Sequence, residues 1–591
     1  MCGISGWFLE PGGHRDPHSL AALAGALAHR GPDDRGSYHD PERGIALAHN
    51  RLSIIDLSAA GHQPMLSDDG ATVLVYNGEL YNFRELRAEL EGRGHSFVSK
   101  SDTEVVLKSF MEWGNGALSR FCGMFALALW SRRSGTLLLA RDPLGMKPLY
   151  YTSLPCGGIT FVSEIKAFLA LPGFKARMTP TALRQFLEFG YTFDAELTSL
   201  AGVSKLPPGC YLECVNGVAG RPVTYFSLPA PDRSDRRTRE EREEELHDVL
   251  SKVVAQHLIA DVPVGLLLSG GLDSSVTAAL ASRHSRITTI SMGFADSEID
   301  ERPFARAVSN HIGSDHREVT INPGEVVETL EEVVPVFDDL FADWGTFSTR
   351  LLYRKCREQG IKVVLVGEGS DELFGGYPIF SATEELNGPQ DWQLFQLYRR
   401  YAGQRYGTEF FRFRKIMRAY LREGNGDLFH AVRLFEIRNQ VPNNYVMKVD
   451  KASMAVSVEA RAPFLDRRVA ELACLTPGNL LLGEGTSKLL LREMAERYDL
   501  LPREITRRAK FGGSIANSWM DSSYRFRAFA REVILDRSGW TDELGLRGAM
   551  TDYFDGRRQG YRFPRAISVF RNLAWRLLLL NLWSRHYLGK K

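Results

Sequence analysis

The chain has 591 residues, of which 44% are hydrophobic and 25% are charged, and its formal net charge is +1. This length is too great for a single hydrophobic core and indicates two or more domains. The near-neutral charge balance excludes the electrostatic footprint of a nucleic-acid-binding protein and a polybasic membrane patch.

The chain opens with MCGISGWF, and we expect removal of Met1 to leave Cys2 with both a thiol and a free α-amine. The thiolate is the nucleophilic form of cysteine, and an α-amine with a pKa of roughly 7.7–8.0 can act as its base. Eight residues alone do not establish a nucleophile, because short motifs recur by chance. No signal peptide is predicted, and seven scattered cysteines favour a reduced, cytoplasmic setting.

The first part of the chain contains short alternating runs that predict strands at 44–57, 71–83, 124–142 and 157–164. Helical spacing occurs at 19–30 and 103–113. This mixture predicts an antiparallel α+β domain built in layers, over residues 2–215. The charged, proline-marked stretch 216–240 predicts an exposed linker, and the next helix begins near its end.

From residue 241 onward, buried-type strands alternate with helices. The strands 262–271, 287–294 and 361–369 are each followed by a helical segment. This order predicts an α/β domain, 241–591, with a doubly wound parallel sheet and ligand chemistry at the carboxyl ends of the strands. Beyond about 380 the chain is mainly helical, and the apolar run 574–588 is too short for the roughly 20 residues of a membrane span. We therefore predict a buried terminal helix and no membrane role.

The stretch VGLLLSGGLDSSVTAAL reads as a strand, a glycine-serine turn and a helix. It is neither a Walker A loop nor GxGxxG, yet its backbone and hydroxyl groups can hold a pyrophosphate. A carboxylate inside such a loop, Asp273, would repel phosphate unless a cation lies between them, which predicts a magnesium ligand. A glycine turn that only caps a helix is the alternative. The phosphate-binding candidates are Ser269, Gly270, Gly271, Ser274 and Ser275.

A second acidic loop follows the strand KVVLV. It contains Glu368, Asp371 and Glu372, and three carboxylates within five residues are costly to cluster unless a cation or a chemical role holds them. Asp371 is the natural partner of Asp273 for Mg²⁺. The same residues also suit a capped helix start, and both interpretations can hold together.

At this point the sequence resembles the glutamine-hydrolysing asparagine synthetase family over nearly its whole length. The resemblance rests on MCGISG, RGPDDRG, YNGELYN, SDTEVVL and ARDPLGMKPLYY in the first half, and on LLLSGGLDSS, GEGSDELFGGY and VDKASMAVSVEARAPFLD in the second. It implies an N-terminal-nucleophile layered sandwich with antiparallel sheets between helices. An ATP pyrophosphatase-type domain with a helical C-terminal part is expected to follow.

The resemblance also implies roles for residues of the first half. Cys2 would attack the side-chain amide of glutamine and release ammonia through a thioester. Asn77 and the Gly78 N–H would form the oxyanion hole. Arg51 would grip the glutamine α-carboxylate, a task that suits a guanidinium. The groups that would receive the α-ammonium are Glu79 and Asp102.

In the second half, the resemblance implies that an acceptor carboxylate attacks the α-phosphorus of ATP and that ammonia then captures the acyl-adenylate. Lys488 matches the lysine that neutralises charge during adenylation, and Glu368 matches the carboxylate that assists ammonia attack. Val366 stands where many members have serine. The implied ATP-binding residues are Leu267, Ser269, Gly270, Gly271, Asp273, Ser274, Met292, Val366 and Gly367.

The leading hypothesis is therefore a cytoplasmic glutamine-dependent asparagine synthetase, with ATP as substrate, Mg²⁺ as cofactor and aspartate as the default acceptor. Asp343, Trp344 and Thr346 are not obviously those of a strict aspartate site, and 507–520 only loosely resembles the family's basic-glycine element. An amidotransferase acting on another carboxylate, such as a sugar uronate or a peptide or antibiotic precursor acid, therefore stays open.

Two further alternatives have less support. A non-catalytic relative is disfavoured because the implied catalytic residues are all present. A ring-closing β-lactam-type synthetase typically lacks the nucleophilic cysteine. The resemblance also suggests a homodimer, and the expected partners are glutamine, ATP and the acceptor acid, without nucleic acid or membrane.

Overall fold

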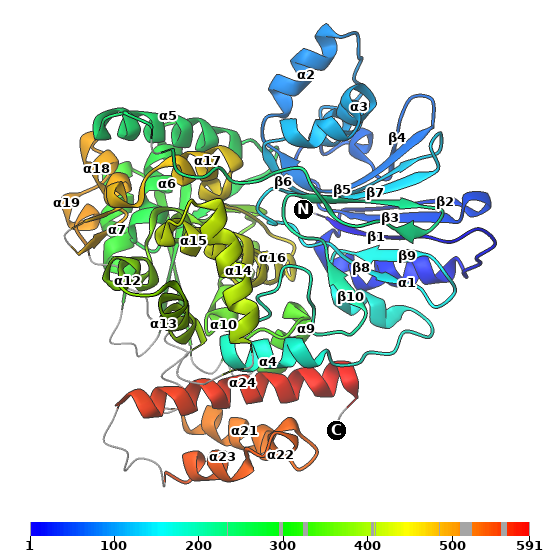
Figure 1. The fold of residues 1–591 in the computed structure, drawn as a ribbon. Coiled ribbons are helices and arrows are strands. Elements are labelled where there is room, and N and C mark those ends of the chain that lie inside the picture. Colours follow the sequence, from blue (N-terminus) through cyan, green and yellow to red (C-terminus); the bar gives the residue numbers. More distant parts are fainter. Residues whose placement is uncertain are drawn as a thin grey trace.

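The computed structural model describes residues 2–232, 234–294, 300–322, 325, 329–402, 407, 409–483, 485–508, 523–556 and 564–589. In Figure 1 the blue and cyan N-terminal domain lies beside the green and yellow second domain, and a long red helix runs beneath both. Met1 and most of the segment 507–520 lie outside the described residues.

Two antiparallel sheets form the centre of the N-terminal domain. The first has the order β10-β8-β9-β1-β3-β2, and the second has the order β12-β11-β7-β6-β5-β4, with β13 also on β11. The first sheet consists of β1 (Gly3–Phe8), β2 (Asp34–Asp40), β3 (Ile45–Arg51), β8 (Tyr150–Ser153), β9 (Ile159–Val162) and β10 (Val203–Lys205). The second consists of β4 (Met65–Leu66), β5 (Thr72–Leu80), β6 (Gly123–Ser131), β7 (Thr136–Arg141), β11 (Cys210–Val215), β12 (Val218–Ala219) and β13 (Val223–Thr224).

Helices cover the outer faces of both sheets. α2 (Phe83–Gly92) and α3 (Asp102–Trp113) pack on the second sheet, while α1 (His18–Ala26) packs on the first. Strands buried on both faces read as continuous apolar runs, which is why LALW and TLLLA lack a clean alternation. The predicted layered sandwich with antiparallel sheets between helices is confirmed.

The core between the two sheets gives a stability prediction. Trp130 is 1% exposed, and its ring meets Phe8 edge to face at 5.0 Å. We expect Trp130→Ala to destabilise this domain by about 3–5 kcal/mol, because it removes buried apolar surface and leaves a cavity. Denaturant unfolding of the N-terminal domain measures the change. Val98→Ala, at an 86% exposed position, is the matched control and should change stability by less than about 0.5 kcal/mol. An equal loss of stability in both variants would contradict the placement of Trp130 in the core.

The segment 216–240 carries the chain to the second domain. Its two short strands, β12 and β13, still pair with β11 of the N-terminal sheet. The next helix, α5 (Arg239–His257), begins with a capping box in which Thr238 and Glu241 bond each other's backbone N–H groups. The charged run therefore serves in part as a helix start.

The second domain is built on a parallel sheet with the order β16-β15-β14-β17-β18. β14 lies between β15 and β17, so the strand order reverses there, and such a switch point leaves a crevice at the carboxyl ends of the strands. The predicted doubly wound α/β domain is confirmed. Its strands are β14 (Val264–Leu267), β15 (Thr288–Phe294), β16 (Asp315–Ile321), β17 (Val363–Leu365) and β18 (Glu459–Arg461). Its flanking helices include α6 (Leu272–Ser282), α7 (Arg302–Ile312), α10 (Thr346–Glu358) and α11 (Ser370–Phe374).

The remainder of the chain is mainly helical, as expected from its sequence, and also contains the short antiparallel pair β19 (Leu482–Gly483) and β20 (Thr486–Ser487). The helices are α9 (Leu330–Phe337), α12 (Pro378–Glu385), α13 (Gln390–Ala402), α14 (Phe410–Glu423), α15 (Leu428–Phe435), the π-helix Glu436–Tyr445, α16 (Val446–Met454), α17 (Arg467–Leu475), α18 (Leu489–Arg497) and α19 (Arg503–Thr506). The C-terminal group comprises α21 (Tyr524–Ile534), α22 (Trp540–Glu543), α23 (Arg547–Phe554) and α24 (Pro564–Leu588).

α24 is the red helix that runs beneath both domains in Figure 1. Arg576 donates to the carbonyls of Leu187 and Glu188, at the end of α4 (Pro180–Phe189), over 2.6 and 2.9 Å. Trp583 donates to the Asp338 carbonyl of the second domain over 3.2 Å. The predicted buried terminal helix is therefore confirmed. Across the described residues, no helix has the length and apolarity that a bilayer crossing requires.

Buried charges also join the two domains. Arg30 is fully buried and pairs with Glu164 of its own domain over 2.6 Å and with Asp450 of the second domain over 2.9 Å. Lys147 reaches the same Asp450 over 3.5 Å. Removing one member of such a network leaves a buried charge without its partner, which is strongly destabilising, so these pairs favour the observed docking of the two domains.

Candidate active sites

The first candidate site lies at the N-terminal end of β1. Cys2 is 6% exposed, and its backbone N–H donates to Asn77 Oδ1 over 2.8 Å. Burial raises the pKa of the Cys2 thiol, and the nearby Arg51 cation acts in the opposite direction. All seven cysteines, Cys2 among them, are free of disulfides.

Asn77 and Gly78 lie on β5 beside this thiol. The Nδ2 group of Asn77 is buried without a hydrogen-bond partner among the described residues, so it can donate to a developing oxyanion. Gly78 packs against β6 so closely that a Cβ would come within 2.3 Å of the Met124 carbonyl oxygen. Only glycine fits at this position of β5, directly after Asn77.

The charged groups expected to bind glutamine are also buried in this region. Asp102 begins α3, accepts from the Leu80 N–H over 2.8 Å and, because of burial, has a pKa raised to about 6. Glu79 on β5 is 5% exposed and lies 3.3 Å from Arg461 of the second domain. Arg51 donates to the carbonyls of Ile55, Asp56 and Ser58, so the structure shows it holding this loop.

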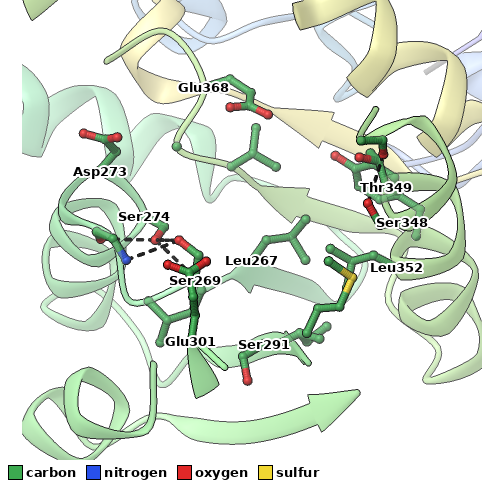
Figure 2. A pocket seen from close by; sticks show the side chains of 18 of the residues that line it. Leu267, Ser269, Asp273, Ser274, Ser291, Glu301, Ser348, Thr349, Leu352 and Glu368 are labelled. Atoms are coloured by element: carbon green, nitrogen blue, oxygen red, sulfur yellow. Dashed lines mark hydrogen bonds between the residues drawn. The ribbon is translucent and has the colours of Figure 1, made fainter. Parts of the chain in front are cut away.

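The second candidate site is a cavity of about 520 Å³ at the switch point of the parallel sheet. Figure 2 shows Ser269 and Ser274 on one side of it, Leu267 in the middle, and Ser348, Thr349 and Leu352 across from them. Glu368 borders the cavity from a third side. The predicted ATP-binding residues that line it are Leu267, Ser269, Gly271, Asp273, Ser274, Met292, Val366 and Gly367.

The glycine-serine turn before α6 forms one wall. Ser269 Oγ accepts from the Gly271 N–H over 3.2 Å and contacts Ser274 Oγ at 3.1 Å. Gly270 lies in the same turn but does not line the cavity. Its φ of 73° and its close contact with α7, where a Cβ would meet the Ala305 nitrogen at 2.6 Å, both require glycine. Ser275 differs from the expectation: it is one residue further around the helix, fully buried, and does not line the cavity.

The acidic loop after β17 meets the turn through Asp273 and Asp371. Ser370 Oγ donates to Asp273 over 2.7 Å, and Gly367 is so close that a Cβ would meet the Ser274 nitrogen at 2.8 Å. Lys488 Nζ contacts Asp273 at 2.6 Å and Asp371 at 2.7 Å. The structure therefore brings together the predicted metal ligands and the predicted catalytic lysine, although they lie far apart in sequence.

Lys488 has two unusual properties. Its backbone is left-handed, with φ 57°, a strained conformation for a residue other than glycine. Its side chain is 5% exposed, and although burial opposes its charge, Asp273 and Asp371 raise the pKa of the ammonium. Gly376 makes this possible, since a Cβ there would come within 1.8 Å of Asp371 Oδ1. The surrounding fold thus holds a charged lysine against Asp273 and Asp371, two residues that line the cavity.

The opposite end of the cavity contains residues whose roles the sequence did not reveal. Lys448 on α16 lies 3.4 Å from Asp343, and both line the cavity. The Tyr353 hydroxyl is buried with no hydrogen-bond partner among the described residues. Burial raises the pKa of Glu368, Lys448 lowers it, and the neighbouring carboxylates raise it further. No sequence signal singles out Lys448 or Tyr353, although Lys448 lies just before the quoted run VDKASMAVSVEARAPFLD.

Thr346 has a structural position. It is fully buried, and its hydroxyl donates to the Asp343 carbonyl over 3.0 Å at the start of α10. Trp344 stacks on Trp575 of α24 with ring centroids 4.3 Å apart. Both tryptophans border a second cavity of about 320 Å³, which shares Asp343 and Gly345 with the first cavity.

A layered sandwich with a buried N-terminal cysteine, joined to a doubly wound domain with a nucleotide-type crevice, defines the class of glutamine amidotransferase ligases. Residues 1–225 match the family described as glutamine amidotransferase domain, and residues 245–585 match the family described as asparagine synthase. The chain belongs to the glutamine-hydrolysing asparagine synthetase family.

Several relatives extend this comparison. Asparagine synthetase [glutamine-hydrolyzing] 1 of Bacillus subtilis is 30% identical over 567 residues, covering 87% of this chain and 86% of the relative. Asparagine synthetase B of Escherichia coli is 29% identical, covering 88% of this chain and 84% of the relative. Amidase chry2 of Gibberella zeae is 33% identical over 66% of this chain and 62% of its own length. The solved structure of glutamine phosphoribosylpyrophosphate amidotransferase from B. subtilis gives a TM-score of 0.29 at 17% identity, covering 62% of this chain and 81% of that chain.

Proposed function

We propose that the protein is a glutamine-dependent asparagine synthetase, which hydrolyses glutamine at Cys2 and amidates the side-chain carboxylate of aspartate with ATP. The observation that carries the choice of aspartate is the Asp343–Lys448 pair at the end of the cavity away from Lys488. One anion and one cation side by side complement the α-ammonium and α-carboxylate of an amino acid.

In the first site, the thiolate of Cys2 attacks the amide carbon of glutamine. Asn77 Nδ2 and the Gly78 N–H stabilise the oxyanion, and Glu79 and Asp102 receive the α-ammonium. Arg51 grips the α-carboxylate in this proposal, and the loop carbonyls it binds orient its guanidinium. The thioester forms as ammonia leaves, and water then releases glutamate.

In the second site, the acceptor carboxylate attacks the α-phosphorus of ATP, and pyrophosphate leaves toward the turn formed by Ser269, Gly271 and Ser274. Lys488 stabilises the charge that develops on the phosphates. Ammonia then attacks the acyl carbon, AMP leaves, and Glu368 accepts the proton. A carboxylate with a raised pKa suits this task, because a general base works best when its pKa lies near the working pH.

Asp273 and Asp371 suit a magnesium ion. Two carboxylates that converge on one cation provide the hard oxygen donors that Mg²⁺ prefers, and Mg²⁺ commonly takes one or two carboxylates together with substrate phosphates. When bound, Mg²⁺ would neutralise phosphate charge. We further propose the domain limits 2–215 and 241–591, a cytoplasmic setting and a homodimer, by resemblance to the family.

A different acceptor is the second candidate. The cavity bordered by Trp344 and Trp575 adjoins Asp343, and the Tyr191 hydroxyl in its wall is buried without a partner among the described residues. A bulkier carboxylic acid could extend into this space. Relatives at similar identity include proteins named amidases, so a relative's name does not decide the acceptor.

A panel of acceptor acids tests the proposal, with glutamine and MgATP and with pyrophosphate release as the signal. We expect aspartate to give pyrophosphate and asparagine. We also expect Lys448→Ala to raise the KM for aspartate by about 10- to 100-fold, because it removes a charged contact. Lys355→Ala, whose ammonium pairs with Glu358 near the surface, is the matched control. A signal only with bulkier acids would favour the second candidate, and no signal with any acid would contradict both.

A further inference from the structure

One arginine of the second domain reaches into the glutamine site of the first. Arg461 lies on β18, the edge strand of the parallel sheet, and is fully buried. Its Nη2 atom lies 3.3 Å from Oε2 of Glu79 on β5. The sheet of the second domain thus delivers a cation to a carboxylate that the first domain keeps in its glutamine pocket.

The guanidinium of Arg461 is held in place from several sides. Its Nη1 donates to the carbonyls of His257 and Ile259, at the end of α5, over 2.7 Å each. Its Nε donates to Glu459 over 2.6 Å, and its Cζ atom lies 5.9 Å from the ring centroid of Tyr81. These contacts hold Nη2 at 3.3 Å from Glu79, as an ion pair without a hydrogen bond, so the pairing depends on the docking of the two domains.

The backbone of the same residue supports the other active site. The Arg461 carbonyl accepts a hydrogen bond from the Val366 N–H over 2.9 Å. Val366 starts the loop that carries Glu368 and Asp371 and lines the nucleotide cavity. A single residue therefore contacts the nucleotide loop through its main chain and the glutamine pocket through its side chain.

Arg461 is the nearby cation that favours the ionised form of Glu79. Burial and Glu459 raise the pKa of Glu79 well above its ordinary value, and Arg461 acts in the opposite direction. A buried carboxylate without a positive partner takes up a proton rather than remain charged. A protonated Glu79 would no longer attract the α-ammonium of glutamine.

We propose that Arg461 is a positioning residue of the glutaminase reaction, which holds Glu79 as an oriented carboxylate and so completes the glutamine pocket from the synthetase domain. This inference rests on the proposed function, because it requires that Glu79 binds the α-ammonium of glutamine. It follows that the N-terminal domain alone has an incomplete substrate pocket.

Steady-state kinetics of the full-length Arg461→Met variant test the proposal. We expect the KM for glutamine in the glutaminase assay to rise by about 10- to 100-fold, with a smaller change in kcat. Pyrophosphate release driven by ammonium chloride should remain near the wild-type rate. Arg461→Lys should recover part of the loss, since it restores the charge but not the planar fork. In a Glu79→Gln background, Arg461→Met should add little further, because both changes act on one contact.

A matched variant separates positioning from domain docking. Arg467 also crosses the interface and donates to the Ser119 carbonyl over 2.7 Å, but it contacts no residue assigned to the glutamine pocket. Arg467→Met should leave the KM for glutamine unchanged. Equal KM values for Arg461→Met and wild type, or an equal rise in both arginine variants, would overturn the inference.

The ammonia-driven signal shows in the same experiment whether the proposed synthetase function itself stands. If Arg461→Met fails to fold, Arg461→Lys carries the test, and an unchanged KM there overturns the inference.

Discussion

Cys2→Ala should lower glutamine-dependent amidation by about 10⁴-fold or more, because the thiolate is the nucleophile that opens the amide. Ammonia-dependent amidation should continue at close to its normal rate, since Lys488 and the nucleotide cavity lie in the other domain. The measurement is product formation with glutamine and, separately, with ammonium chloride.

Cys156→Ala is the matched control for this change. Cys156 is exposed and takes no part in either candidate site, so both nitrogen sources should support normal rates in this variant. If Cys2→Ala kept its glutamine-dependent rate, or if the purified chain retained its first methionine while fully active, the nucleophile would have to be another group.

Lys488→Ala should lower pyrophosphate release by about 10²- to 10³-fold with either nitrogen source. A preorganised positive charge that faces the negative charge of a transition state commonly raises the rate by about this factor. Here the ammonium of Lys488 is held by Asp273 at 2.6 Å and by Asp371 at 2.7 Å. Glutaminase activity without ATP should persist, because that site lies in the other domain. Pyrophosphate assays and glutamate assays on the same preparation give both numbers.

Two further variants sharpen this test. Gly376→Ala should have a similar effect, since its Cβ would displace Asp371 and Lys488 without removing any charge. Arg497→Ala at the end of α18, the helix that follows Lys488, should leave pyrophosphate release unchanged, because this guanidinium pairs with Glu243. Full activity in both Lys488→Ala and Gly376→Ala would show that adenylation does not depend on this lysine.

The elements set by local pattern could be predicted from the sequence. The strand, turn and helix around Ser269 and Asp273 follow from an apolar run, two glycines and a good helix former within one short segment. The layered N-terminal domain follows from alternating strands in the same way. Both types of domain and their order agree with the structure.

The contacts between distant segments could not be predicted in the same way. Lys488 was identified only through the family resemblance, and its left-handed backbone has no sequence signal. The ion pairs of Arg461 and Lys448 have no local sequence signal, because their partners, Glu79 and Asp343, come from distant parts of the chain. Domain docking, rather than local preference, brings these side chains together.

The position of α24 has a consequence for how the protein is made. Its contacts with α4 and with Asp338 tie the two domains together, yet it follows every other described helix in the chain. Domains generally fold in order as they leave the ribosome, so the contacts of α24 form last. During translation, nascent chains therefore pass through a stage in which the buried charge pairs can already join the domains while the contacts of α24 with α4 and Asp338 have not formed.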